Sequence, residues 1–550
     1  MAKRETGTVD AARIRRVARD AFGFEALRDG QEQAIAAVAG GRDVLVVMPT
    51  GSGKSAIYQV AGLLRGGMSL VVSPLLALQR DQVEALREQR PESGEVAALN
   101  STLTKLQREE LLDRVADGAV AFLFLAPEQF SSGDTLERLQ ASPPSLFVVD
   151  EAHCIAEWGH DFRPDYLRLG AARTALGGPP VLALTATAAG PVRDEIVERL
   201  EMRDPVVIVH GFDRPNLRLV VEPVTGEPQK LERLRELLPE LGRPGIVYVA
   251  TRQHADQLAE RLRGDGHAAS AYHAGLGKDQ RRRIQAEFMD DELDAVVATV
   301  AFGMGIDKPR VAFVIHYDLP GTLDAYYQQI GRAGRDGEPA TAALLYDPDD
   351  VHLQRFLQGA PAVDAEVLEQ VVEAVDDVGG TLGVDQLSQA TGLSVTQLQS
   401  VLNRLADIGA IETDGHRAVR RSAGAPSGSE AAEAAEGLQE RHKAFEASRV
   451  AMMRDYAETP SCRRAFLMSY FGERFEPPCE NCDRCLAGEG EPATENGPFA
   501  VGTRVDHASF GEGQVVRYEN GKVVVLFDEI GYQSLALDVV CERGLLREGE

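Results

Sequence analysis

Residues 43–55, DVLVVMPTGSGKS, decide the fold of the first part of the chain. The run 43–48 is short, apolar and rich in Val, as is typical of a strand buried in a parallel sheet. Gly51 and Gly53 follow it, and glycines let backbone N–H groups come close to phosphate oxygens at the start of a helix. The stretch therefore predicts a strand, a phosphate-binding loop and a helix, the first unit of an α/β domain.

The residues after these glycines have side chains suited to a nucleotide. Lys54 can reach the β- and γ-phosphates, and the hydroxyl of Ser55 can ligate Mg²⁺. The general pattern G-x-x-x-x-G-K-[ST] has Met48 here in place of its first Gly, so the loop has the shorter form x-x-T-G-x-G-K-S. A chance glycine-rich turn is the alternative, but the position between a strand and a helix favours a site for ATP.

Similar apolar runs recur along the chain, and helical patterns separate them. The alternation extends over residues 42–215 and again over 216–346, although the two parts show no close sequence repeat. It predicts two doubly wound α/β units in tandem, with a cleft between them. The further runs are 69–74, 121–127, 146–151 and 181–188 in the first part, and 244–250, 268–274, 294–302, 311–318 and 342–347 in the second.

Two acidic residues end one of these runs, in the sequence DEAH at 150–153. Ligands of α/β sheets bind at the carboxyl ends of the strands. Asp150 is therefore expected to hold Mg²⁺, usually through water, and Glu151 to orient and deprotonate the attacking water. Paired carboxylates at a strand end could instead be solvated caps, a reading that the phosphate loop makes weaker.

A pair of arginines lies in the second α/β unit, in QQIGRAGR at 328–335. Arg332 and Arg335 are three residues apart and share a helix face or one turn. The charge that develops on a γ-phosphate requires a planar, always-charged donor, which arginine supplies. We expect both to act as arginine fingers across the cleft; surface arginines are the alternative.

Four of the six cysteines lie together, with two of the intervals only two residues long. In a cytosolic chain such spacing indicates a metal before disulfides. Four thiolates suit tetrahedral Zn²⁺ with no open position, so the expected site is structural. Its ligands would be Cys462, Cys479, Cys482 and Cys485.

Taken together, these motifs resemble those of RecQ-type DNA helicases, over residues 20–348 and 438–488. The resemblance implies two tandem RecA-like parallel-sheet domains, 1–215 and 216–348, and a helical zinc-binding module, 349–363 with 438–488. It implies that ATP hydrolysis with Mg²⁺ drives 3′-to-5′ movement on single-stranded DNA. The expected outcome is unwinding of duplex or branched DNA in recombination and repair.

Several further nucleotide contacts follow from this resemblance alone. FEALRDGQ, 24–31, resembles the adenine-reading segment, in which Phe24 would stack on adenine while Arg28 and Gln31 bond its edge. ATVAFGMGIDKP, 298–309, resembles the nucleotide-contacting motif of the second domain. The remaining expected residues are Ser52 in the phosphate loop, Gly305 and Asp307 near the sugar and phosphates, and Gln328 positioning the finger region.

An aromatic loop, AHCIAEWGHDFRPDY at 152–166, is similar to the one that RecQ proteins have after the Mg²⁺ motif. By that match Trp158, Phe162 and Arg163 would meet single-stranded DNA, because aromatic faces stack on bases without reading sequence. His153 and His160 lie beside them and could relay the nucleotide state. A lone Trp is ordinarily a core residue, but the polar neighbours of Trp158 make a poor core.

The rest of the chain departs from the usual family order. Residues 364–422 have the spacing of a helix-turn-helix, expected to be winged, inserted before the cysteines. The low-complexity stretch 423–437 and the stretch 489–499 are interpreted as linkers. Residues 500–550 alternate apolar and polar side chains, resemble a small Tudor- or SH3-like β-barrel, and would bind protein partners.

The formal net charge of −27 argues against non-specific binding of polyanions, so any DNA track must be local. One basic island, 441–474, has seven Lys/Arg and four Asp/Glu. The sequence favours it as the duplex-facing surface, with Arg449, Arg454, Arg463 and Arg464. The insertion is acidic, with ten Asp/Glu and three Lys/Arg over 364–420, which favours a structural or protein-contacting role over DNA contact.

Neither a signal peptide nor an apolar run of membrane-spanning length is recognisable, so a cytoplasmic, nucleoid-associated protein without a membrane contact is expected. Two rival functions stay open at this stage. An RNA helicase would share the tandem domains, although the aromatic loop and the zinc module favour DNA. A DNA-tethering or scaffold protein would use the insertion and the tail, although complete catalytic motifs speak against that as the whole function.

Overall fold

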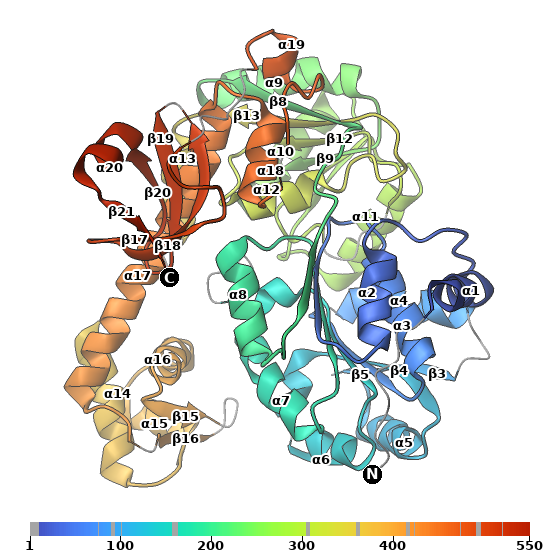
Figure 1. Cartoon of the computed structure of the whole chain (residues 1–550), viewed down its shortest axis with the longest axis vertical. Helices are drawn as coiled ribbons and strands as arrows, with labels where there is room; N and C mark the ends of the chain where they lie inside the picture. The colour runs from blue at the N-terminus through green and yellow to red at the C-terminus, as the bar shows by residue number, and fades with distance from the viewer. Residues whose placement is uncertain are drawn as a thin grey trace.

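The computed structural model places two α/β domains one above the other, with the rest of the chain along one side (Figure 1). The first domain is at the lower right, the second at the top, and the C-terminal sheet and the insertion lie on the left. The structure describes residues 10–74, 76–89, 94–100, 102–131, 133–156, 163–303, 308–358, 364–413, 418–422, 424–473, 475–490, 497–519 and 521–549.

The first domain is built on a seven-stranded parallel sheet in the order β3-β4-β2-β5-β6-β1-β7. Helices lie on both of its faces, so β1, β2, β5 and β6 are buried along their whole lengths, which explains their continuous apolar sequence. The strands are β1 (Val44–Val47), β2 (Ser69–Val72), β3 (Glu95–Leu99), β4 (Val120–Leu125), β5 (Leu146–Val149), β6 (Val181–Thr185) and β7 (Val206–Val209). The helices are α1 (Ala11–Phe22), α2 (Gln31–Ala39), α3 (Lys54–Arg65), α4 (Leu76–Gln89), α5 (Lys105–Ala116), α6 (Gly133–Ala141), α7 (Leu169–Ala175) and α8 (Gly190–Arg199).

The second domain has a six-stranded parallel sheet in the order β10-β11-β9-β12-β13-β8. Two tandem RecA-like parallel-sheet domains, as expected from the sequence, are thereby confirmed. The strands are β8 (Leu217–Pro223), β9 (Gly245–Tyr248), β10 (Ala269–Tyr272), β11 (Ala295–Ala298), β12 (Phe313–His316) and β13 (Ala340–Tyr346). The helices are α9 (Gly226–Leu241), α10 (Arg252–Gly264), α11 (Lys278–Met289), α12 (Leu323–Ile330) and α13 (Asp350–Gln358).

The insertion forms a small body with its own core. Three helices, α14 (Ala365–Val378), α15 (Val384–Thr391) and α16 (Val395–Asp407), pack on an antiparallel sheet of order β14-β16-β15. The strands are β14 (Leu382–Gly383), β15 (Ile411–Thr413) and β16 (Ala418–Arg421). The leucines that suggested a helix-turn-helix are core residues here, among them Leu387, Leu398, Leu402 and Leu405.

The expected linker 423–437 is wrong from residue 428 onward, because those residues begin the 31-residue helix α17 (Gly428–Glu458). Ser427 caps this helix, and its hydroxyl exchanges hydrogen bonds with Glu430. Ala431, Ala432 and Ala435 then pack into the core of the insertion. The stretch is low in complexity because alanine repeats, and alanine is the best helix former rather than a flexible residue.

The C-terminal residues form a five-stranded antiparallel sheet of order β20-β19-β18-β17-β21, with the short helix α20 (Leu537–Arg543). This sheet is fixed to the helices before it, α17 and α18 (Arg463–Tyr470). The Tyr532 ring stacks on Tyr470 with centroids 5.4 Å apart, and the Arg517 guanidinium lies 3.6 Å from the centre of the Phe466 ring. The strands are β17 (Arg504–His507), β18 (Gly511–Glu519), β19 (Lys522–Phe527), β20 (Gly531–Ala536) and β21 (Leu546–Glu548).

Among the described residues, none of the helices has both the length and the apolar character needed to cross a membrane.

Candidate active site between the two α/β domains

The phosphate loop connects β1 to α3 and depends on two glycines. Gly51 and Gly53 have φ angles of 80° and 78°, in the left-handed region that other residues rarely adopt. A Cβ atom at Gly53 would also lie 2.9 Å from Nε2 of Gln31, closer than van der Waals contact allows. The loop therefore keeps its shape only with glycine at these positions.

Lys54 lies inside this loop and not in solvent. Its Nζ donates hydrogen bonds to the carbonyl oxygens of Met48 (2.8 Å) and Pro49 (3.1 Å). Burial lowers the pKa of Lys54, whereas the nearby carboxylates of Glu151 and Asp150 raise it. The ammonium group of Lys54 is thereby held at the loop, in the position from which it is predicted to reach phosphate oxygens.

The two carboxylates of the DEAH sequence follow the carboxyl end of β5. Asp150 accepts a hydrogen bond from the backbone N–H of Glu151 (3.1 Å) and a long one from Nε2 of Gln82 (3.5 Å). Burial, followed by the charge of Glu151, raises the pKa of Asp150 to about 7. Glu151 itself has a φ of 49°, a left-handed conformation that is costly for a non-glycine residue and typical of functional sites.

These residues fit a Mg²⁺ ion. Asp150 and the Ser55 hydroxyl line the same cavity, and carboxylate and hydroxyl oxygens are ligands of this hard cation. Asp150 is buried beside a second carboxylate, that of Glu151, so two negative charges lie close together at this strand end. A divalent cation would compensate these charges.

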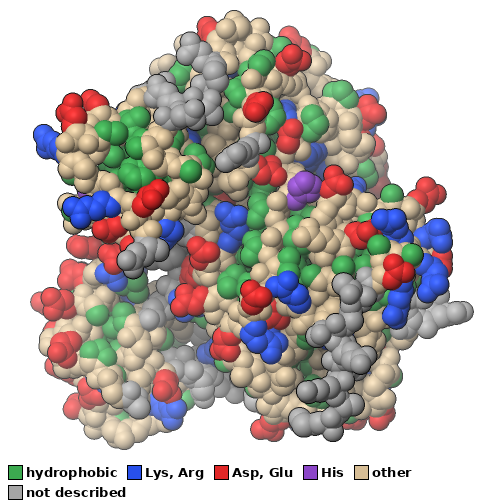
Figure 2. Space-filling view, viewed as in Figure 1, with side chains coloured by type: hydrophobic (Ala, Val, Ile, Leu, Met, Phe, Trp, Pro, Cys, Tyr) green, Lys and Arg blue, Asp and Glu red, His purple; other side chains and the backbone are tan. Residues whose placement is uncertain are grey.

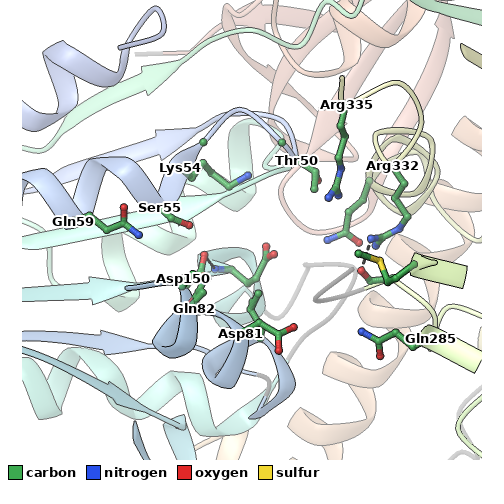
Figure 3. A pocket seen from close by; sticks show the side chains of 18 residues that line it. Thr50, Lys54, Ser55, Gln59, Asp81, Gln82, Asp150, Gln285, Arg332 and Arg335 are labelled. Atoms are coloured by element: carbon green, nitrogen blue, oxygen red, sulfur yellow. Dashed lines mark hydrogen bonds between the residues drawn. The ribbon is translucent and has the colours of Figure 1, made fainter. Parts of the chain in front are cut away.

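A cavity of about 420 Å³ between the domains brings these groups together with residues of the second domain. Figure 3 shows Lys54, Ser55 and Asp150 on one side of it and Arg332 and Arg335 on the other. The predicted cleft between the two units is thus present. Its lining also includes Thr50, Gln59, Asp81, Gln82, Gln285 and Gln328.

Both predicted arginine fingers, Arg332 and Arg335, line this cavity. Arg332 is buried and donates to the carbonyl oxygen of Gly303. A Cβ atom at Gly303 would clash with this guanidinium, so a larger residue there would require Arg332 to shift. Arg335 crosses to the first domain, where a Cβ at Gly51 would lie 3.4 Å from its Cγ.

The segment expected to read adenine is attached to the phosphate loop. Nε2 of Gln31 donates to the carbonyl oxygens of Ser52 (2.9 Å) and Gly53 (3.0 Å), and its Oε1 accepts from the N–H of Arg28 (2.8 Å). The Arg28 guanidinium donates to the carbonyl oxygen of Gly51. Arg28 and Gln31 therefore support the loop that would hold the phosphates.

Phe24 lies further from the loop. Its ring stacks on Phe22 with centroids 5.6 Å apart, and with Arg28 it lines a separate cavity of about 550 Å³ on the first domain. Stacking of Phe24 on adenine therefore stays a prediction.

The loop after the DEAH sequence is fixed at both ends. His153 lies with Nδ1 2.8 Å from Oγ1 of Thr185 and 3.4 Å from Oε2 of Glu151. Burial lowers the pKa of His153 to about 3, so its imidazole is neutral at pH 7. At the other end, Nη1 of Arg163 donates to the carbonyl oxygen of Pro74 (3.1 Å). The two ends of the loop therefore contact Thr185 at the end of β6 and Pro74 after β2.

Five of the predicted site residues lie outside the described residues. They are Trp158, His160 and Phe162 in the aromatic loop, and Gly305 and Asp307 in the second domain. Sequence reasoning in turn did not single out Thr50, Gln59, Asp81, Gln82 or Gln285, which line the cavity. Asp81 and Gln82 follow the apolar run 69–74 within one helix, α4, and Gln285 lies on α11, far from the other lining residues in the sequence.

The four predicted zinc ligands come together. The Sγ atoms of Cys462, Cys479, Cys482 and Cys485 all lie within 4.8 Å of one another, and those of Cys479 and Cys485 are 3.8 Å apart. Zn–S bonds of about 2.3 Å at tetrahedral angles place sulfur atoms about 3.8 Å apart, so the cluster fits Zn²⁺.

The segment between these cysteines packs on β8, the edge strand of the second sheet. The N–H of Leu219 donates to the carbonyl oxygen of Asn481 (3.2 Å), and the N–H of Val221 donates to the carboxylate of Asp483 (3.2 Å). The short helix α19 (Asp483–Leu486) follows immediately. The cysteine cluster therefore attaches the zinc module, residues 438–488, to the second domain.

We expect Cys482→Ala to lose the bound zinc and to make residues 438–488 sensitive to protease, because a closed zinc site contributes directly to folding. Elemental analysis should give one zinc per native chain and less than one in the variant. Cys541→Ala is the matched control, since Cys541 is exposed and outside the cluster. A Cys482→Ala protein with full zinc and unchanged protease resistance would contradict the assignment.

The prediction of a duplex-facing basic island is wrong for three of its four arginines, which are buried. Arg463 donates to Asp483 (2.6 Å), Arg464 pairs with Asp213, and Arg449 pairs with Glu446 (3.1 Å) and Asp324 (3.5 Å). Arg454, which is half-buried, pairs with Asp455 (3.0 Å). Arg449 and Arg464 thereby join the zinc module to α12 and to the segment before β8, whereas Arg463 and Arg454 pair within the module.

Two tandem parallel-sheet domains, with a phosphate loop and a DEAH strand end facing arginines across a cleft, define a helicase-type motor ATPase. Three families match the chain: DEAD/DEAH box helicase at residues 28–196, helicase conserved C-terminal domain at 229–337, and RecQ zinc-binding at 428–486. The zinc-binding match starts at the first residue of α17.

Two proteins named as RecQ helicases are similar to this chain over most of its length. The ATP-dependent DNA helicase RecQ of Synechocystis is 35% identical over 499 residues, which cover 87% of this chain and 99% of that relative. The ATP-dependent DNA helicase RecQ of Haemophilus influenzae is 34% identical over 86% of this chain, which spans 63% of that relative's length. The chain belongs to the RecQ family of ATP-dependent DNA helicases.

Solved structures share the fold at low sequence identity. The helicase MrfA bound to DNA has a TM-score of 0.52 and 16% identity, covering 77% of this chain and 64% of that one. Dbp5 of S. cerevisiae, bound to RNA and ADP BeF3, has a TM-score of 0.50 and 21% identity, covering 64% of this chain and 92% of that one. At these identities the likenesses show a shared fold and nothing further.

Proposed function

We propose that this protein hydrolyses ATP to move 3′-to-5′ on single-stranded DNA and to unwind duplex or branched DNA in recombination and repair. The observation that carries the proposal is the cavity lined by the phosphate loop of one domain and two arginines of the other. Groups from both domains act on one nucleotide only when the domains are closed, so hydrolysis is tied to domain movement. The polarity follows from the family resemblance.

In this proposal Lys54 binds the β- and γ-phosphates, and Ser55 and Asp150 hold Mg²⁺. When bound, Mg²⁺ would supply positive charge that neutralises the phosphates. Glu151 takes the proton of the attacking water, while Arg332 and Arg335 stabilise the charge on the transferring phosphoryl group. The further nucleotide contacts are Phe24, Arg28, Gln31, Gly51, Ser52, Gly53, Gly305, Asp307 and Gln328.

In this proposal, binding of single-stranded DNA to the aromatic loop changes the ATP site. His153 lies 3.4 Å from Glu151 at one end of the loop, and Arg163 donates to the carbonyl oxygen of Pro74 at the other. Trp158, His160 and Phe162 lie between these anchors in sequence. A change of the loop on binding single-stranded DNA therefore acts directly on the water-activating carboxylate.

Trp158→Ala is expected to lose most of the DNA stimulation of ATPase and most unwinding, because stacking on bases contributes about 1–3 kcal/mol per base. ATP binding should persist, since the phosphate loop is a separate segment. The measurement is the ATPase rate with and without single-stranded DNA. Phe356→Ala, which removes an exposed aromatic ring on α13, is the control. Full stimulation and unwinding in Trp158→Ala would show that the loop is only structural.

The direct test of the proposed function is unwinding of labelled forks, overhangs, junctions and quadruplexes with ATP and Mg²⁺. ATPase stimulation by single-stranded DNA and by RNA of the same sequence is compared in parallel. Stronger stimulation by RNA would make the protein an RNA helicase, and binding without unwinding of any substrate would favour a tethering role.

We infer that the insertion is a winged-helix-like body with a structural or protein-contacting role. Figure 2 shows Asp and Glu side chains gathered over it, and Arg404 is the single Lys or Arg of α16. DNA-reading helices are normally basic. We further infer that the C-terminal sheet closes into a Tudor- or SH3-like barrel that binds protein partners, and that the protein works in the cytoplasm on the nucleoid.

A further inference from the structure

The segment between β7 and β8, residues 210–216, is the hinge that joins the two α/β domains. A side chain of the zinc module hydrogen-bonds to the backbone of this hinge. The carboxylate of Glu473 accepts hydrogen bonds from the N–H groups of Gly211 (2.9 Å) and Phe212 (3.1 Å). Consecutive N–H groups bound by one carboxylate fix the direction of the chain at the point where it leaves the first domain.

Further contacts from the zinc module continue along the hinge. The ring of Phe471 lies parallel to that of Phe212, with centroids 4.4 Å apart and an angle of 6°. Nδ2 of Asn481 donates to the carbonyl oxygen of Pro215 (2.8 Å), and the guanidinium of Arg464 pairs with Asp213. The hinge is therefore held from Gly211 to Pro215.

The same hinge also binds residues 332–335, which contain both arginine fingers and are called the finger loop. Nη2 of Arg214 donates to the carbonyl oxygens of Ala333 (2.9 Å) and Gly334 (2.8 Å), the two residues between Arg332 and Arg335. Nδ2 of Asn216 donates to the Gly334 carbonyl as well (2.9 Å). A rotation of the hinge backbone must therefore move the finger loop.

A second connection runs through α12, which precedes the finger loop. The hydroxyl of Tyr327 donates to the carbonyl oxygen of Phe212 (2.6 Å), and its ring packs on Phe471 with centroids 4.7 Å apart. Gln328, the neighbour of Tyr327, lines the nucleotide cavity. Phe212, whose N–H is bound by Glu473, thus contacts the helix that leads to both fingers.

We propose that Glu473 is a positioning residue for ATP hydrolysis: by fixing the hinge, the zinc module sets the arginine fingers against the phosphate loop. The proposal rests on the finger role assigned to Arg335 under the proposed function. Transition-state stabilisation requires its donors within a fraction of an ångström of their working positions. A hinge released at Gly211 and Phe212 loses that precision without losing any group that touches ATP.

The test is steady-state ATPase with saturating single-stranded DNA on the full-length protein. Glu473→Ala is expected to lower kcat about tenfold and to change KM for ATP less than twofold, because a finger acts mainly in the transition state. Glu473→Gln, which keeps one acceptor oxygen, should recover part of kcat. Glu476→Ala is the matched control, since Glu476 is exposed and makes no hydrogen bond or ion pair with the described residues. Its kcat should equal that of the parent.

A double-mutant cycle with Arg335→Ala shows whether Glu473 acts through the fingers. In the Arg335→Ala background, Glu473→Ala should cause little further loss, whereas independent effects would multiply. Multiplied losses, an unchanged kcat in Glu473→Ala, or loss of zinc from that variant would each overturn the proposal. If Arg335→Ala alone keeps normal turnover, the finger assignment fails; if only Glu473→Ala keeps it, the finger assignment stands and the hinge proposal fails.

Discussion

Glu151→Gln is expected to lower ATP turnover by about 10²- to 10⁴-fold, the usual contribution of a general base, while ATP binding persists. The substitution keeps the shape of the side chain and removes its ability to accept a proton. Asp150, the proposed Mg²⁺ ligand, and Lys54, the proposed phosphate ligand, both remain. Lys54→Ala should abolish turnover as well, but with weakened nucleotide binding, because it removes the phosphate contact.

Steady-state ATPase and nucleotide-binding assays on both variants distinguish these two defects. Glu198→Gln makes the same chemical change on the exposed side of α8 and serves as the control, with turnover expected to equal that of the parent. Near-normal turnover in Glu151→Gln or in Lys54→Ala would refute the corresponding assignment.

Arg335→Ala is expected to lower kcat by about 10³-fold, at the lower end of the effect of an arginine finger. Its side chain crosses from the second domain to lie against Gly51 in the phosphate loop, so it joins the nucleotide only when the domains are closed. Because the guanidinium acts on the transferring phosphoryl group, kcat and kcat/KM should fall together.

Arg335→Lys separates charge from geometry, since lysine keeps the positive charge and lacks the planar fork. We expect it to recover only a small part of the lost kcat. Arg310→Ala, which removes an exposed arginine from the same domain, should leave kcat unchanged. Equal rates for Arg335→Ala and the parent would show that Arg335 is a surface residue without a catalytic role.

The parts of the site that could be predicted from the sequence are those whose residues are contiguous. The phosphate loop and the DEAH strand end each combine an apolar run with the polar residues directly after it. Strands β1 and β5 are inner strands of the same parallel sheet, so both sets of polar residues lie at the carboxyl ends of its strands. The spacing of the cysteines was informative for the same reason, because three of them lie within seven residues.

Features that depend on distant partners could not be predicted in this way. The basic island was read as a DNA surface because the partners of Arg449 and Arg464, namely Asp324 and Asp213, lie more than a hundred residues away in the chain. The hydrogen bond from the Gly211 N–H to the Glu473 carboxylate joins residues 262 apart, so no local sequence pattern predicts it. The start of α17 was missed because its alanines become apolar contacts only once the insertion has folded against them.

The packing of Asn481 and Asp483 on β8 has a consequence for a chain that has lost its zinc. β8 is the last strand of its sheet, and an uncovered strand of this kind presents unpaired N–H and C=O groups to other chains. In the intact protein, Leu219 and Val221 direct their N–H groups to the cysteine-bearing segment instead. We therefore expect loss of zinc to uncover β8 and to favour aggregation through edge-to-edge strand pairing.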